Sequence, residues 1–126
     1  MRDYNICYSL DSNYTEQLLV SVASILKNAD ESENFNFYVL DGGLNEADRK
    51  SIEALKKIKT FNVKFIRVNN EDFTVCPLLK DKSEHYKNYH VTLPTYFRFK
   101  LAEYLPDIKN VLYLDCDVIV RKSLRE

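Results

Sequence analysis

Apolar residues follow two different spacings along this chain. Four short runs rich in aromatic and β-branched residues lack helical spacing and are typical of buried strands. They cover residues 4–10, 35–41, 63–68 and 109–114. In other segments apolar residues recur three and four positions apart, which predicts amphipathic helices. These helices are expected over residues 14–28, 44–58 and 92–105.

Polar residues mark the ends of the predicted helices. Ser12 or Asn13 can cap the first helix, and Asn45 with Asp48 forms a variant of the capping box at the second. Residues 74–91 show no clear period and are rich in Lys, Asp, Asn and Tyr, so we expect a long loop there. Loops of that length inside compact domains are often functional lids.

The alternation of strands and helices predicts an α/β fold. Right-handed crossovers would give a Rossmann-like, mostly parallel sheet with helices on both faces. No internal repeat or linker divides residues 1–126, so they are expected to form one domain or part of one. Sheets of this kind bind ligands beyond the carboxyl ends of their strands.

Three polar clusters fall at such strand ends, at residues 11–13, 41–43 and 115–117. In extended backbone the α-carbons of Asp115 and Asp117 would lie about 6–7 Å apart on the same side of the strand. Both carboxylates could then reach one hard cation, Mg²⁺ or Mn²⁺, while Cys116 points into the core. The alternative is that the two aspartates only cap a turn or a following helix.

Composition narrows the classes of function. The 126 residues include 18 basic and 19 acidic side chains, so no basic surface is available to attract nucleic acid or anionic lipid over long range. Cys7, Cys76 and Cys116 lack CxxC spacing, which argues against a disulfide framework and a zinc site. Neither a signal peptide nor a run of about 18 apolar residues is present, so we expect a cytoplasmic protein without a transmembrane segment.

Four segments in register carry a resemblance to a known family. The chain resembles the N-terminal half of a family 8 glycosyltransferase, the group that contains glycogenin and the bacterial lipopolysaccharide galactosyl- and glucosyltransferases. The matching segments are NICYSLDSNYTEQLLVSVASIL, FYVLDGGLNEADR, TLPTYFRFKLAEYLP and KNVLYLDCDVIV. The resemblance implies a nucleotide-diphospho-sugar transferase fold of the GT-A type.

The resemblance also implies a metal-assisted donor site. Asp115 and Asp117 would hold Mn²⁺, or Mg²⁺, against the diphosphate of a UDP-hexose, with the backbone of Cys116 near the ribose. Arg98 matches a basic residue that contacts the donor's phosphate or sugar in relatives, and it would stabilise the charge that leaves with UDP. The alternative for Arg98 is pairing with a structural carboxylate.

The first loop of relatives recognises uracil. By that resemblance Ser9, Asp11, Asn13 and Tyr14 belong to the donor site, with hydrogen bonds from Asp11 and Asn13 and a stacking face from Tyr14. The alternative is that Asp11 and Asn13 are turn and capping residues and that Tyr14 is a surface aromatic. We expect Asp41, in the LDGG segment, to position its turn rather than to touch substrate.

The implied reaction is hexosyl transfer with retention of anomeric configuration. The acceptor would be the hydroxyl of a glycan or lipid-linked saccharide, so a location at the inner face of the membrane is compatible with it. Residues 74–91 would cover the donor and exclude water.

The resemblance covers the first part of the family domain only. The chain is expected to be truncated after the DxD motif, and His85 and His90 do not match the metal-binding histidine that relatives carry in their later half. An exposed sheet edge could then promote self-association. Two alternatives remain: a non-catalytic nucleotide-binding fragment, and a haloacid dehalogenase-type phosphohydrolase whose first Asp is a nucleophile.

Overall fold

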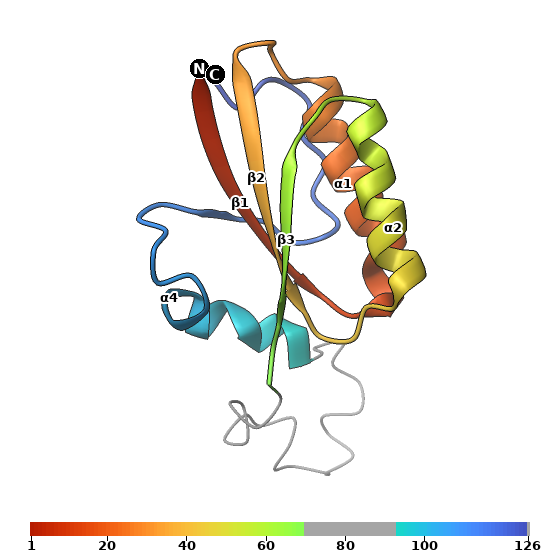
Figure 1. Cartoon of the computed structure of the whole chain (residues 1–126), viewed down its shortest axis with the longest axis vertical. Coiled ribbons are helices and arrows are strands. Elements are labelled where there is room, and N and C mark those ends of the chain that lie inside the picture. Colours follow the sequence, from red (N-terminus) through yellow and green to blue (C-terminus); the bar gives the residue numbers. More distant parts are fainter. Residues whose placement is uncertain (70–92, 126) are drawn as a thin grey trace.

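Four parallel strands form one sheet in the order β3-β2-β1-β4. The computed structural model describes residues 1–69 and 93–125 of the chain (Figure 1). The strands are β1 (Arg2–Leu10), β2 (Glu33–Asp41), β3 (Asn62–Arg67) and β4 (Leu112–Tyr113). The predicted α/β fold with a parallel sheet is therefore confirmed. The fourth strand is shorter than the run at 109–114 predicted.

Helices cover both faces of this sheet, as expected (Figure 1). One face packs against α1 (Thr15–Lys27) and α2 (Glu46–Ala54), which continues into the 3₁₀ turn η2 (Leu55–Lys57). The other face packs against the 3₁₀ helix η5 (Leu93–Lys100) and the short α4 (Leu101–Tyr104).

The first helix is capped differently from the prediction. A 3₁₀ turn, η1 (Ser12–Tyr14), lies between β1 and α1, and the side chain of Asp11 caps it by accepting from the backbone N–H of Asn13 at 2.9 Å. Capping by Ser12 or Asn13 is therefore wrong, because the extra turn moves the first free amides upstream. The capping box at α2 is confirmed, with both hydrogen bonds between Asn45 and Asp48 present.

The third predicted helix is mostly a 3₁₀ helix. Its aromatic residues have modest helix propensity, so tertiary packing determines the local geometry. Phe97 is fully buried, and a Cβ at Gly42 would lie only 3.0 Å from its ring. Glycine at position 42 thus lets η5 lie close to the turn after β2, and a larger residue there would have to displace the ring of Phe97.

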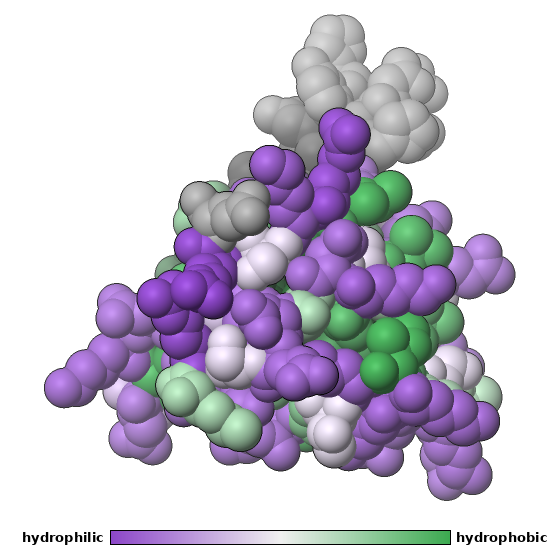
Figure 2. Space-filling model, turned by 90° about the horizontal axis from the view of Figure 1, so that it is seen from above, coloured by the Kyte–Doolittle hydropathy of each residue, from purple (hydrophilic) through white to green (hydrophobic). Residues whose placement is uncertain are grey.

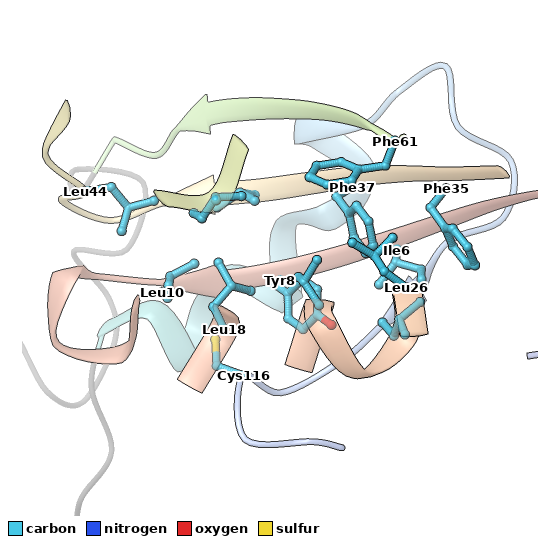
Figure 3. Packing of buried hydrophobic residues seen from close by; sticks show 14 residues of the cluster. Ile6, Tyr8, Leu10, Leu18, Leu26, Phe35, Phe37, Leu44, Phe61 and Cys116 are labelled. Atoms are coloured by element: carbon cyan, nitrogen blue, oxygen red, sulfur yellow. The ribbon is translucent and has the colours of Figure 1, made fainter. Parts of the chain in front are cut away.

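Aliphatic side chains and four aromatic rings, those of Tyr8, Phe35, Phe37 and Phe61, fill the core between the sheet and the helices α1 and α2 (Figure 3). Phe37 stacks on Tyr8 with ring centroids 6.3 Å apart and meets Phe61 edge to face at 5.2 Å. The buried hydroxyl of Tyr8 shares a hydrogen bond of 2.7 Å with Ser21 Oγ. The hydroxyl of Tyr8 is therefore satisfied, and no buried side-chain N or O atom of the described residues lacks a hydrogen-bond partner.

Three asparagines form a ladder across the opposite face. Asn5, Asn36 and Asn62 occupy paired positions on β1, β2 and β3. Asn36 Nδ2 donates to Asn5 Oδ1 at 3.1 Å, and Asn62 Nδ2 donates to Asn36 Oδ1 at 2.9 Å. We call this row the asparagine ladder; it lies on the polar part of the face that η5 and α4 do not cover.

The molecular surface is largely hydrophilic in the view of Figure 2, with apolar side chains gathered on one side. Among the exposed large apolar residues are Val20, Phe99 and Ile119. In the described ranges, no helix has the length and apolar character that a membrane span needs.

Asp41 organises the turn that follows β2. Its Oδ1 accepts hydrogen bonds from the backbone N–H groups of Gly43 at 2.9 Å and Leu44 at 2.7 Å, and its Oδ2 accepts from Arg49 Nη2 at 2.5 Å. Gly43 has a φ of 139°, which only glycine adopts without strain. The expectation that Asp41 positions its turn is confirmed.

Phe37→Ala is expected to lower the free energy of unfolding by about 3–5 kcal/mol, because it leaves a cavity among buried rings. Urea denaturation followed by far-UV circular dichroism measures this change. Val20→Ala is the control, since Val20 is 55% exposed and should change the value by less than about 0.5 kcal/mol. Equal effects of the two substitutions would contradict the described core.

Asp41→Asn is expected to lower the free energy of unfolding at pH 7 by about 1–3 kcal/mol. Burial raises the pKa of Asp41, but the hydrogen bonds from Arg49, Leu44 and Gly43 outweigh it and hold this pKa below its ordinary value. A lowered folded pKa stabilises the fold above the unfolded pKa of about 3.9. This contribution is lost as the pH falls through the folded pKa.

Urea denaturation between pH 7 and pH 3 checks this pH dependence. The difference between wild type and Asp41→Asn should stay constant from pH 7 to about pH 5 and shrink below about pH 4. Asp107→Asn, a substitution of an exposed aspartate, controls for the change of net charge. A difference that grows on acidification would mean that Asp41 is not stabilised in its charged form.

Candidate functional site

The end of β1 collects the residues of the candidate site. β4 pairs with β1 only at Ile6↔Leu112 and Cys7↔Tyr113, but two further bonds keep the chain beside β1. The N–H of Leu114 donates to Cys7 O at 3.0 Å, and Cys116 Sγ donates to Ser9 O at 3.5 Å. The DxD segment therefore lies next to the loop that follows β1.

Asp115 and Asp117 lie in a turn, so the prediction of an extended backbone is wrong. The N–H of Val118 donates to Asp115 O at 3.2 Å, which closes a β-turn with Cys116 and Asp117 at its centre. The pairing of β4 with β1 ends at Tyr113, so no ladder of hydrogen bonds keeps Asp115 and Asp117 extended. The turn buries Cys116, as expected, and leaves both carboxylates exposed to solvent.

The buried thiol of Cys116 is influenced by three nearby negative charges. Its pKa is raised to about 12 by burial and further by the negative charges of Asp115, Asp117 and Asp11. The thiol is therefore uncharged at neutral pH. The charge of Asp11 acts on this thiol as well, and Cys116 Sγ donates to Ser9 O, so the DxD turn lies on the side of the sheet where the first loop begins.

The first loop has a clear structural role. Asp11 caps η1, and the N–H of Tyr14 donates to Asp11 O at 3.2 Å. Asn13 is exposed, and Tyr14 is half-buried against the core cluster beside α1. The turn and capping role of Asp11 is thus present, and Tyr14 is a partly exposed aromatic whose ring also packs against the core. Donor contacts of Asp11, Asn13 and Tyr14 stay predictions.

Arg98 projects from η5 to the same strand ends. Its Nη2 lies 3.9 Å from Asp115 Oδ1, and its guanidinium carbon lies 5.2 Å from the centre of the Tyr113 ring. The side chain of Arg98 is 40% exposed and that of Asp115 is 60% exposed, so both are accessible to a ligand. The structure therefore brings the predicted cation and one predicted metal ligand together.

Ser9 contacts Tyr113, a residue that was not predicted to belong to the site. Ser9 Oγ and Tyr113 Oη share a hydrogen bond of 2.5 Å. Tyr113 was hidden within the apolar run because an aromatic residue there is typical of a core strand. The available signal was its position two residues before Asp115, on the side of the strand that Ser9 also faces.

A cavity of about 310 Å³ opens beside the DxD turn. It lies between the first turns of α1 and residues 116–119, and Asp117 forms part of its wall. Its other lining residues are Glu16, Gln17, Val20, Cys116, Val118 and Ile119. Asp117 is thus reached from a concave surface.

The described ranges contain no group of three or more His, Cys, Asp and Glu side chains that could hold a metal ion. Two carboxylates on a turn fit a site of the Mg²⁺ or Mn²⁺ type, which takes one or two protein carboxylates and fills its other positions with water and phosphate oxygens. The expected lid at 74–91, with Cys76, His85 and His90, lies outside the described residues.

Comparisons with known proteins identify relatives of this chain. A lipopolysaccharide 1,3-galactosyltransferase of Salmonella typhimurium is 31% identical over 98% of this chain and 34% of its own length. Lipopolysaccharide glucosyltransferase WaaO of Escherichia coli is 29% identical over 95% of this chain and 33% of its own. The chain thus spans about a third of the length of these relatives.

A solved structure shows the same fold. The galactosyltransferase LgtC, in complex with donor and acceptor sugar analogues, superposes with a TM-score of 0.76 and 39% identity, over 98% of this chain and 40% of that one. The profile of glycosyl transferase family 8 matches residues 5–126. The chain therefore belongs to glycosyl transferase family 8.

Proposed function

We propose that this chain is the donor-binding part of a retaining hexosyltransferase that uses a UDP-hexose. The observation that carries the proposal is the exposed turn of Asp115 and Asp117, which lies beside Arg98 and the end of β1 at the carboxyl edge of a parallel sheet in a family 8 chain. Ligands of such sheets bind at this edge.

The charge of the site supports a role for a divalent cation. Asp11, Asp115 and Asp117 carry three negative charges, and Arg98 supplies one positive charge, so these residues sum to two negative charges. A nucleoside diphosphate would be repelled by such a site unless a cation came with it. Asp115 and Asp117 would hold Mn²⁺ or Mg²⁺, which would neutralise charge on the leaving diphosphate.

The remaining residues would bind and orient the donor. Arg98 is placed to contact a phosphate oxygen, since its guanidinium lies beside Asp115 and is open to solvent. Ser9, Asp11, Asn13 and Tyr14 would contact the nucleoside from the first loop, and the backbone of Cys116 would lie near the ribose. The acceptor hydroxyl would then attack the anomeric carbon of the hexose as UDP leaves. The transferred hexose would keep its anomeric configuration.

The acceptor is proposed from the relatives. Several act in lipopolysaccharide synthesis, which supports a glycan or lipid-linked saccharide as acceptor and a place at the cytoplasmic side of a membrane. Two functions of the 126 residues differ in turnover: a catalyst would convert the donor, whereas a nucleotide-binding fragment would only bind it. Family membership leaves the haloacid dehalogenase alternative without support.

Self-association through β4 stays part of the proposal. Within the described sheet β4 is an edge strand that pairs with β1 alone, and Leu112 is 45% exposed. Unpaired strand edges of this kind can pair with another chain.

UDP and Mn²⁺ are expected to strengthen each other's binding. Calorimetric titration of the chain with UDP should show an affinity at least about tenfold higher with Mn²⁺ than with EDTA, and by linkage UDP should raise Mn²⁺ affinity by the same factor. Asp115→Asn and Asp117→Asn should each remove most of this coupling, because each deletes a charged oxygen ligand.

Asp107→Asn is the matched control, since it removes an exposed carboxylate outside the turn. UDP binding that does not respond to metal, or that survives both aspartate substitutions, would refute the proposed donor site. Hydrolysis of a UDP-hexose, with the released anomer read by NMR, would then decide between the catalyst and the binding fragment. Release of phosphate from simple phosphate esters instead would support a phosphohydrolase.

A further inference from the structure

Tyr113 makes contacts with residues from two other elements of the site. Its hydroxyl bonds Ser9 Oγ at the end of β1, and its ring lies beneath the guanidinium of Arg98 from η5. Two residues later the same chain segment carries Asp115. Tyr113 thus connects the end of β1, the helix η5 and the DxD turn.

The ion pair alone does not fix Arg98. The separation of 3.9 Å between Arg98 Nη2 and Asp115 Oδ1 is longer than the 2.7–3.2 Å of an N–H···O hydrogen bond. Pairs between exposed charges of this kind contribute little in water. The ring of Tyr113 at 5.2 Å lies within the distance of about 6 Å at which aromatic faces attract cations.

Tyr113 is itself held on both sides. Its backbone pairs with Cys7 of the buried strand β1, and its hydroxyl hydrogen bond of 2.5 Å to Ser9 Oγ anchors the far end of the ring. Tyr113 also packs against the second core cluster, which contains Phe97 and Leu105. A ring held in this way offers Arg98 a platform of fixed orientation.

We propose that Tyr113 is a positioning residue: its ring holds the guanidinium of Arg98 beside Asp115, so that cation and carboxylate face the diphosphate together. This inference rests on the proposed function for its effect on donor binding. The geometric part, a guanidinium held over the ring, is a property of the free chain.

A double-mutant cycle tests the effect on binding. Tyr113→Leu is expected to weaken UDP binding in the presence of Mn²⁺ by about three- to tenfold, which lies within the range of a cation–π contact. Tyr113→Phe keeps the ring and should bind UDP within about twofold of wild type. In an Arg98→Met background, Tyr113→Leu should have no further effect, because the two residues act through one contact.

Tyr38→Leu is the matched control. Tyr38 packs against the same core cluster, so the substitution removes a ring from that cluster. It should lower thermal stability and leave UDP affinity unchanged. A Tyr113→Leu variant that binds UDP like wild type, or that weakens binding equally in the Arg98→Met background, would overturn the proposal.

NMR of the free chain separates this proposal from the proposed function. The Nε–Hε resonance of Arg98, assigned by its loss in Arg98→Met, should be shifted upfield by the ring, remain shifted in Tyr113→Phe and move toward the other arginines in Tyr113→Leu. An unshifted resonance in the wild type would overturn the inference even if UDP binds. A shifted resonance in a chain that does not bind UDP would instead refute the donor site alone.

Discussion

Hydrogen bonding of β1 to a parallel neighbour on each side is the constraint on which the site depends. Its paired residues run along all of β2 but reach only two residues of β4. Beyond that ladder, carbonyl groups near the end of β1 accept from the N–H of Gly42, the N–H of Leu114 and Cys116 Sγ. The turn after β2 and the DxD turn are thus both bonded to the end of β1, beside the loop that follows it.

The gathered groups are mostly acidic, and this gives the site its chemistry. The negative charges of Asp115, Asp117 and Asp11 all act on the buried thiol of Cys116, and the guanidinium of Arg98 lies 3.9 Å from Asp115. An acidic surface of this kind attracts positive charge, and this is the physical basis of the divalent cation that we propose there. Cys116 packs into the core between the two aspartates, whose carboxylates stay in solvent.

The repeating apolar pattern made the sheet, its direction and both helical layers predictable. The spacing of apolar residues in a strand or helix follows the face that is buried. Ile6, Tyr8, Phe35 and Phe37 are apolar and buried, so their positions in the sequence marked that face. The capping box at Asn45 was predictable because its chemistry is local. The placement of acidic clusters at one edge followed from the topology of parallel strands.

Features that depend on tertiary contacts were not predictable. The 3₁₀ turn before α1, the β-turn at Asp115 and the shortness of β4 arise where pairing with a distant segment stops. The packing of η5 reflects the space that Gly42 leaves for Phe97. The contacts of Tyr113 were not predictable either, since its partners are 15 and 104 positions away in the sequence and only its place two residues before Asp115 marked it.

The asparagine ladder has a consequence for how the sheet assembles. A parallel strand that slid by two residues would keep its apolar side inward, so hydrophobic burial alone tolerates that error. In the observed register β1 and β2 make two amide contacts on this side, Asn36 with Asn5 and Asn34 with Asp3. A slide of β2 by two residues would set Asn34 opposite Asn5 in one direction and Asn36 opposite Asp3 in the other, so either slide leaves one such contact in place of two. The amides thus favour the observed alignment of the strands, and that alignment places the turn after β2 beside the end of β1.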